Sequence, residues 1–101
     1  ARWTFRLVEV MSRCSIPVIL ADGLTLPFEE IIDWASAVVR FDESYANDPR
    51  AIVSRLPTDP AVIERMQQLN CDIYNTYFQS GTKMFEGLVL ALAERVRRSQ
   101  M

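Results

Sequence analysis

The stretch "SIPVILADGLTLPFEEIIDW", residues 15–34, decides the fold class of this 101-residue chain. Its apolar, β-branched run at 16–21 predicts a strand that is covered on both faces, because such strands are continuously hydrophobic. The run stops at Asp22 and Gly23, which form a turn signal. A buried strand that ends in an acidic turn is typical of an α/β sheet whose strand ends face a ligand.

Helices are predicted on both sides of this strand. Pro27 suits the first position of a helix, and Glu29 and Glu30 suit its first turn, so a short helix that ends near Trp34 is expected. Before the strand, apolar residues recur with helical spacing over 3–14. The strand is therefore expected to lie between two helices.

The second half of the chain carries clear helix boundaries. Asp-Pro pairs at 48–49 and 59–60 each supply an N-cap followed by proline at the first helical position, and Gly81 separates the last two helices. The apolar faces of these two long helices are expected to cover each other. In chain order, the predicted elements are helix 3–14, strand 16–21, helix 27–34, strand 37–41, helix 49–56, helix 60–78 and helix 82–98.

This order predicts the α/β fold class, as part of an open sheet of parallel strands with flanking helices. The second strand, at 37–41, is also expected to be covered on both faces. Two strands do not make a full sheet, so further strands are expected upstream. Residues 1–101 are therefore expected to be a fragment of a larger protein.

The amino-acid composition disfavours several classes of function. The net charge of −2 is too small to favour nucleic acid or an anionic membrane as partner, and no apolar run is long enough for a membrane span. Histidine is absent, so no imidazole is available as a general base or metal ligand, and no metal is expected. Cys14 and Cys71 lack metal-site spacing, which favours two small buried side chains.

The helix predicted at 3–14 carries the first candidate site. Arg2 and Arg6 lie at its positive end, where cations are disfavoured but where a helix N-terminus with arginine can bind phosphate. Glu9 lies three residues after Arg6, and two interpretations stay open. The pair is either an ion pair on a solvated face, or a site in which Arg6 binds a diphosphate and Glu9 accepts hydrogen bonds from ribose hydroxyl groups.

Asp22 is the second candidate, because ligands of open α/β sheets bind outside the carboxyl ends of the strands. The alternative is an ordinary Asp-Gly turn. Tyr74 and Phe78 have the spacing of a helix core rather than of a stacking platform, and the basic segment at 94–98 suits a solvated helix end. No G-x-G-x-x-G, P-loop, G-x-S-x-G or H-E-x-x-H motif is present, which disfavours dehydrogenases, P-loop ATPases and serine hydrolases.

Taken together, "TFRLVEVMSRCSIPVILADGLTLPFEEIIDW", residues 4–34, resembles the exostosin family of glycosyltransferases. The family pattern has three parts, of the form S-x-R-x-x-E, then I-P-V-I, then L-P-F and I-D-W, and the order and spacing of all three are kept. The matching positions are Thr4, Arg6, Glu9, Ile16, Pro17, Val18, Ile19, Leu26, Pro27, Phe28, Ile32, Asp33 and Trp34.

The resemblance implies a GT-B enzyme built from two Rossmann-like domains, with this chain as the C-terminal part of the nucleotide-sugar-binding one. Thr4, Arg6, Glu9 and Asp22 would then hold the donor, for which a UDP-sugar is expected. The acceptor would be a glycan, and the catalytic base would come from the other domain. The family usually has cysteine where Ser15 stands, which implies that a disulfide to upstream sequence is lost or shifted.

The resemblance also implies a cellular location and an oligomeric state for the parent protein. The parent protein would lie in the Golgi or endoplasmic reticulum lumen as a type II membrane protein and would form a homo- or hetero-dimer. No membrane contact is expected from this segment. The alternative function is a non-catalytic, exostosin-like scaffold or partner subunit.

Overall fold

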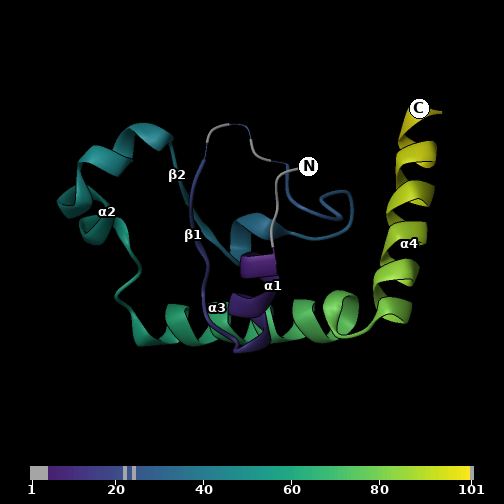
Figure 1. Ribbon diagram of the computed structural model, residues 1–101, viewed down its shortest axis with the longest axis horizontal. Helices are drawn as coiled ribbons and strands as arrows, with labels where there is room; N and C mark the ends of the chain where they lie inside the picture. The colour runs from purple at the N-terminus through teal and green to yellow at the C-terminus, as the bar shows by residue number, and fades with distance from the viewer. Residues whose placement is uncertain (1–4, 22, 24, 101) are drawn as a thin grey trace.

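The computed structural model describes residues 5–21, 23 and 25–100 of the chain (Figure 1). It is a mixed α/β arrangement in which helices surround a two-stranded sheet. The elements are α1 (Phe5–Ser12), β1 (Val18–Leu20), the 3₁₀ turn η1 (Trp34–Ser36), β2 (Val39–Phe41), the 3₁₀ turn η2 (Glu43–Asn47), α2 (Pro49–Arg55), α3 (Pro60–Ile73), the π turn η3 (Tyr74–Phe78) and α4 (Gly81–Ser99).

The two strands are parallel, as the sequence predicts, and Val18 lies opposite Val39. Both are shorter than expected, although the Ala21 N–H donates to the Phe41 carbonyl at 3.1 Å and so extends the pairing by one residue. The prediction that both faces are covered is wrong for this chain, since Val18 is 43% exposed and Arg40 is exposed. Within the described residues the two strands pair only with each other, so each of them is an edge strand.

The segment predicted to be a helix over 27–34 is instead a tight turn followed by η1. Phe28 has a φ of 55°, which lies in the left-handed region and cannot continue a right-handed helix. The N–H groups of Ile31 and Ile32 both donate to the Phe28 carbonyl, at 3.0 and 2.9 Å. The Trp34 indole N–H then donates to the Pro27 carbonyl at 2.8 Å, which closes the turn over the core.

The core lies between α1, the 26–38 segment and the α3–η3 helix. Phe78 is 3% exposed, and its ring centroid lies 5.5 Å from that of Phe28. Tyr74 packs against the same cluster, so the prediction that these aromatic residues belong to the core is confirmed. The buried residues of the cluster are Met11, Leu26, Ile32, Trp34, Ala37, Val38, Ile73 and Phe78.

The two cysteines form a disulfide, so the prediction of two separate buried thiols is wrong. Cys14 has a left-handed φ of 59° just after α1, and this turns its side chain onto α3, where its Cα lies 4.7 Å from that of Cys71. The partners are 57 residues apart, a spacing from which no pairing can be read. The bond fixes the C-terminal end of α1 against α3.

A buried amide ties α3 to the sheet. Asn70 is fully buried, and its side-chain NH₂ group donates to the carbonyls of Ala37 and Met66, each at 2.8 Å. Ala37 lies two residues before β2, so the bond joins the last turn of α3 to the start of that strand. Buried polar groups of this kind are costly when their partners are removed.

Local signals set the starts of the later helices. The carboxylates of Asp48 and Asp59 accept hydrogen bonds from the N–H groups of Ala51 and Ala61, at 3.2 and 3.0 Å, which confirms both predicted N-caps. The Ser80 hydroxyl caps α4 in the same way. The helix predicted over 60–78 is continuous, but its last turn, η3, has π geometry.

The expectation that the two long helices cover each other is wrong. Figure 1 shows α4 rising from one end of α3 rather than lying along it. Its contact with the rest of the chain is close at Gly87, where an added Cβ atom would lie 3.0 Å from Tyr77 Cδ1 and 3.2 Å from Phe28 Cε2. The backbone of α4 therefore lies directly against aromatic rings of η3 and of the 27–31 turn.

Ion pairs complete the attachment of α4. Arg95 Nη2 donates to Glu30 Oε2 at 2.6 Å, and this hydrogen bond lowers the pKa of Glu30. Arg97 and Arg98 both donate to Glu94, and the pKa of Glu94 is lowered to about 2, chiefly by the hydrogen bond from Arg97. The predicted solvated helix end is thus also an ion-pair cluster.

Candidate functional site

The first two turns of α1 place Arg6 and Glu9 on an open face. Their side chains are 85% and 65% exposed, and Arg6 Nε lies 3.8 Å from Glu9 Oε2. The first turn contains no acidic residue, so Arg6 brings a cation to the positive end of the helix. The simple ion-pair interpretation therefore has the right geometry, and both groups remain accessible to a ligand.

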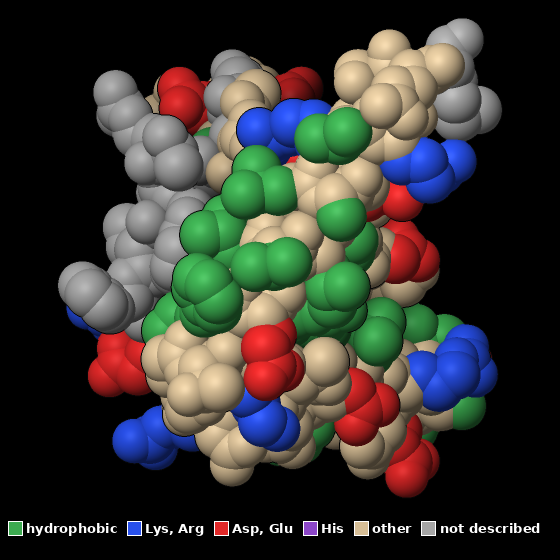
Figure 2. All heavy atoms as spheres, turned by 90° about the vertical axis from the view of Figure 1, so that its right-hand side faces the viewer, with side chains coloured by type: hydrophobic (Ala, Val, Ile, Leu, Met, Phe, Trp, Pro, Cys, Tyr) green, Lys and Arg blue, Asp and Glu red, His purple; other side chains and the backbone are tan. Residues whose placement is uncertain are grey.

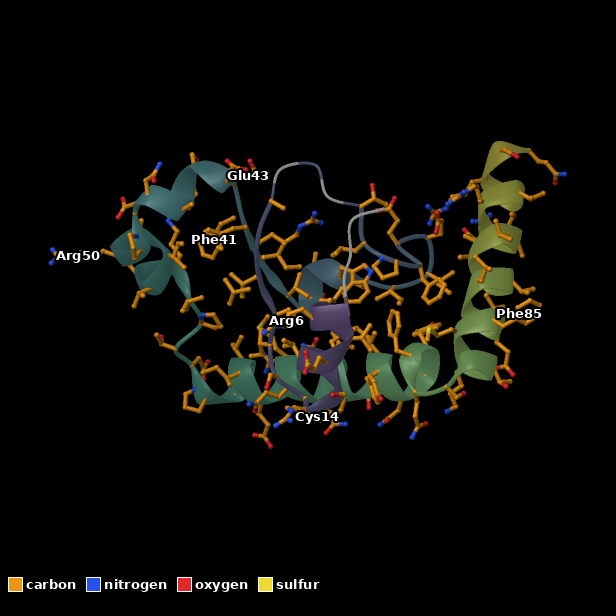
Figure 3. The ribbon with its side chains drawn as sticks, in the orientation of Figure 1. Arg6, Cys14, Phe41, Glu43, Arg50 and Phe85 are labelled. Atoms are coloured by element: carbon orange, nitrogen blue, oxygen red, sulfur yellow. A yellow bond between two sulfur atoms is a disulfide. The ribbon has the colours of Figure 1, made fainter. Side chains whose placement is uncertain are left out.

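The orientation of α1 directs its first turn toward the carboxyl side of the sheet. Figure 1 shows that α1 runs in the direction opposite to β1, so the start of the helix points toward the edge at which the strands end. Figure 3 labels Arg6 near the start of α1 and Cys14 beyond the other end, where the disulfide lies. The disulfide and the core contact of Met11 thus hold the helix in this direction.

Two of the predicted site residues, Thr4 and Asp22, lie outside the described residues. The structure does describe the residues on both sides of Asp22. Ala21 pairs with Phe41, and Gly23 has a φ of 62°, a left-handed conformation that glycine adopts without strain. The turn signal after the first strand is therefore confirmed at Gly23.

A hollow of about 560 Å³ lies at the carboxyl ends of both strands. It lies where β1 and β2 end side by side. Neither Arg6 nor Glu9 is among the described residues that line it. The lining residues are Ala21, Gly23, Arg40, Phe41, Asp42 and Ser44.

The site residues predicted from the sequence do not include the polar residues that line this hollow. Arg40, Asp42 and Ser44 stand at the end of the second strand, in the position that made Asp22 a candidate after the first one. The same rule, applied to both strands, would have found them. A guanidinium, a carboxylate and a hydroxyl group can together bind a polyhydroxylated, anionic molecule.

Side chains of β2, η2 and α2 contact one another beside the hollow at the strand ends. The rings of Phe41 and Tyr45 lie 5.2 Å apart, and the Arg55 guanidinium carbon lies 5.1 Å from the centroid of the Tyr45 ring. Arg55 also donates a hydrogen bond to the Tyr45 hydroxyl. These contacts support the loop that carries Asp42 and Ser44.

A second hollow, of about 620 Å³, lies between η1 and the outer side of α3, away from the strand ends. It contains Ser36, Arg65 and Asp72 beside apolar residues such as Met66. Within the described ranges, no group of three or more cysteine, aspartate or glutamate side chains is placed to hold a metal ion. The described helices also include none that is long and apolar enough to cross a membrane.

Comparison with known proteins supplies the context for this geometry. Residues 1–56 match the family model described as the Exostosin GT47 domain. Exostosin-2 of Bos taurus is 36% identical over 74 residues, which are 73% of this chain and 10% of that protein. Exostosin-1a of Danio rerio is 31% identical over 93 residues, which are 92% of this chain and 12% of that protein.

A plant relative extends the comparison. The probable beta-1,4-xylosyltransferase IRX10L of Arabidopsis thaliana is 41% identical over 69 residues, which are 68% of this chain and 16% of that protein. The chain therefore spans between a tenth and a sixth of the length of these relatives.

Proposed function

Since this chain belongs to the exostosin GT47 family, we propose that it forms the donor-binding part of a glycosyltransferase. The donor is a nucleotide-sugar, with UDP as the nucleotide, and the acceptor is a glycan. In this proposal the chain is the C-terminal portion of a Rossmann-like domain within a GT-B fold. The parallel β1–β2 pair with α1 beside it is compatible with such a fragment.

The observation that carries the proposal is the direction of α1, whose N-terminal turn points toward the side of the sheet on which the strands end. An N-terminal helix turn with an accessible arginine offers N–H groups and a fixed positive charge to a diphosphate. Arg6 is 85% exposed at this turn. Glu9, one turn further on and 65% exposed, would accept hydrogen bonds from the ribose.

The hollow at the strand ends is assigned to the sugar of the nucleotide-sugar donor. Because Arg6 and Glu9 do not line it, the two groups of residues would bind different parts of one ligand. We assign the nucleotide to Arg6 and Glu9, with Thr4 and Asp22 beside it, and the sugar to the hollow. Asp42 and Ser44 would then hydrogen-bond to sugar hydroxyl groups.

The disulfide supports a place in an oxidising compartment. Structural disulfides persist in the secretory pathway and are rare in the cytosol. The Cys14–Cys71 bond joins the helix that carries Arg6 to α3. It fits the proposal that the parent protein works in the Golgi or endoplasmic reticulum lumen.

Titration of the full-length protein with UDP tests the nucleotide half. Arg6→Ala should weaken UDP binding at least about tenfold, while Arg13→Ala, an exposed arginine just beyond the other end of α1, should leave it unchanged. Glu9→Ala should weaken UDP and uridine alike, by about 1–3 kcal/mol. Normal UDP binding by the Arg6 and Glu9 variants, together with lower melting temperatures, would instead assign the pair to stability.

The sugar half needs a separate comparison. Asp42→Asn should weaken the binding of the UDP-sugar more than that of UDP, because the carboxylate would contact only the sugar. Equal losses for both ligands would contradict this assignment. If the protein binds the donor but no acceptor is turned over in any glycan panel, the scaffold alternative replaces the enzyme proposal.

A further inference from the structure

Two neighbouring hollows on one side of α3 form a single groove. The hollow of about 620 Å³ beside η1 and a smaller one of about 220 Å³ share Leu69 and Asp72 in their linings. Along this side of α3 and η3, apolar lining residues recur at every third or fourth position, as residues on one helix face do. They are Val62, Met66, Leu69, Ile73 and Tyr77.

The opposite wall of this groove, which we call the α3 groove, is the segment 31–36. Residues 31–33 line the smaller hollow with 69–77, and residues 35–36 line the larger one with 62–72. The segment therefore runs along α3 in the opposite direction, and the groove follows the helix axis. At about 1.5 Å per helical residue, the groove is about 20 Å long. It has room for an extended chain of several units.

The rim of the α3 groove is polar and its floor is apolar. Asp33 and Ser36 are exposed on one wall. Arg65, Gln68 and Asp72 are exposed on the other, and the apolar residues between the two sets are half-buried or buried. This division distinguishes the groove from the exposed face of α4, over which hydrophobic side chains gather (Figure 2). A concave apolar floor with a few placed polar groups is typical of a ligand-binding site.

Hydrogen bonds orient both carboxylates of the rim. The Ser36 hydroxyl donates to Asp33 Oδ2 at 2.6 Å, and Gln68 Nε2 donates to Asp72 Oδ1 at 3.0 Å. A carboxylate has about four acceptor sites, so each one keeps capacity for hydroxyl donors of a ligand. Because these side chains are already held in place, less conformational entropy is lost when a ligand binds to them.

These features match the chemistry of a sugar chain. A pyranose ring has apolar C–H faces and hydroxyl groups around its edge, so its faces can pack on the floor while its hydroxyl groups donate to the carboxylates. Two carboxylates against one guanidinium disfavour an anionic polymer, because like charges would lie side by side. We propose that the α3 groove binds a neutral glycan chain in this way.

The position of the groove indicates which part of a glycan it holds. Figure 1 shows α3 on the side of the sheet where the strands begin, and the Asn70–Ala37 hydrogen bond joins it to that side. The hollow assigned to the donor sugar lies at the other ends of the strands. The groove would therefore hold units of the acceptor that are remote from the transfer point, a role that rests on the proposed function. Binding energy from such remote units favours long acceptors over short ones.

Isothermal titration of the full-length protein tests the binding itself. The probes are neutral cello-, xylo- and manno-oligosaccharides, each as the disaccharide and the hexasaccharide, with hexagalacturonate as an anionic chain of the same length. At least one neutral hexasaccharide should bind, about tenfold or more tightly than its disaccharide, because only the longer chain follows the whole groove. Hexagalacturonate should bind about tenfold or more weakly than that hexasaccharide, because its carboxylates would face Asp33 and Asp72.

Substitution of Asp72 tests the location of the site. Asp72→Ala should weaken binding of the hexasaccharide about tenfold, since a hydrogen bond to a charged group is lost. Glu64→Ala is the matched control, because Glu64 is also an exposed acid of α3 but lines neither hollow, and it should leave this binding unchanged. Both variants should bind UDP as the wild type does, because neither residue belongs to the proposed donor site.

The outcomes separate the groove from the proposed function. A protein that binds UDP but none of the neutral hexasaccharides at millimolar concentration lacks the glycan site, and the proposed function stands. Hexasaccharide binding that is unchanged in Asp72→Ala takes place elsewhere, and tighter binding of hexagalacturonate contradicts the neutral class; either result overturns the proposal. An oligo-arginine peptide that binds when the saccharides do not, and whose binding is lost in Asp72→Ala, would assign the groove to basic protein segments instead. Binding of a hexasaccharide without binding of UDP would support the groove and refute the proposed function.

Discussion

Removal of the disulfide should cost this chain a large part of its stability. The double variant Cys14→Ser/Cys71→Ser frees two segments that are 57 residues apart in sequence. For a closed loop of that length, the chain-entropy model gives about 4 kcal/mol at 25 °C. A domain of about this size has a total unfolding free energy of about 5–15 kcal/mol, so the loss is a substantial share of it.

Urea denaturation of four samples measures the effect: wild type and double variant, each with and without reductant. The oxidised wild type should unfold at the highest urea concentration, and the other three samples should coincide. Hydrogen exchange should show α1 losing protection first, because the bond holds the end of that helix against α3. If reduction left the wild-type midpoint unchanged, the disulfide would not stabilise the fold and the reasoning would fail.

Three more predictions concern α3 and α4. The unfolding free energy of Gly87→Ala should lie about 1–3 kcal/mol below that of Gly81→Ala in urea denaturation, because a Cβ at 87 would lie 3.0 Å from Tyr77 Cδ1 and the ring must shift, whereas a Cβ at 81 would meet no atom within 4 Å. Asn70→Ala should lower the same quantity by about 1–3 kcal/mol, since the buried Ala37 carbonyl loses its donor. The pKa of Glu94 is lowered from 4.5 to about 2, so its ionised form stabilises the fold above pH 4.5. This contribution is lost as the pH falls toward 2. The melting temperature of Glu94→Gln should therefore depend less on pH between about 2 and 4.5 than that of the wild type.

Local chemistry made much of the fold predictable. The Asp-Pro pairs at 48–49 and 59–60 begin helices because an N-cap and a proline act on adjacent backbone groups only. The β-branched run at 16–21 gave a strand, and the α/β class followed from the order of elements. These signals depend on neighbours in sequence, and at these positions no contact with a distant segment overrides them.

The predictions that are wrong concern positions whose structure depends on contacts between segments distant in the sequence. Pro27 with two glutamates is a sound helix signal, yet the ring of Phe28 packs between η3 and α4, and its backbone becomes left-handed. Cys14 and Cys71 meet because α1 lies on α3, which no spacing rule contains.

The candidate site was predicted in part. The strand-end rule led to Asp22 but was not applied to the second strand, where Asp42 and Ser44 line the hollow. The Arg6–Glu9 proximity followed from helical spacing alone and is confirmed at 3.8 Å. Their roles toward a ligand remain predictions, because an exposed ion pair and a binding pair have the same geometry before a ligand arrives.

The π turn η3 limits how the length of this chain can vary among related sequences. A π turn contains about one residue more than an α turn, and here it spans Tyr74–Phe78, where α3 gives way to the segment before α4. Loss of one residue would allow an ordinary helix but would rotate every later side chain by about 100° about the axis. Phe78 would then leave the core, and Gly87 would no longer face the rings on which α4 rests. Insertions and deletions in relatives should therefore be absent from 74–78.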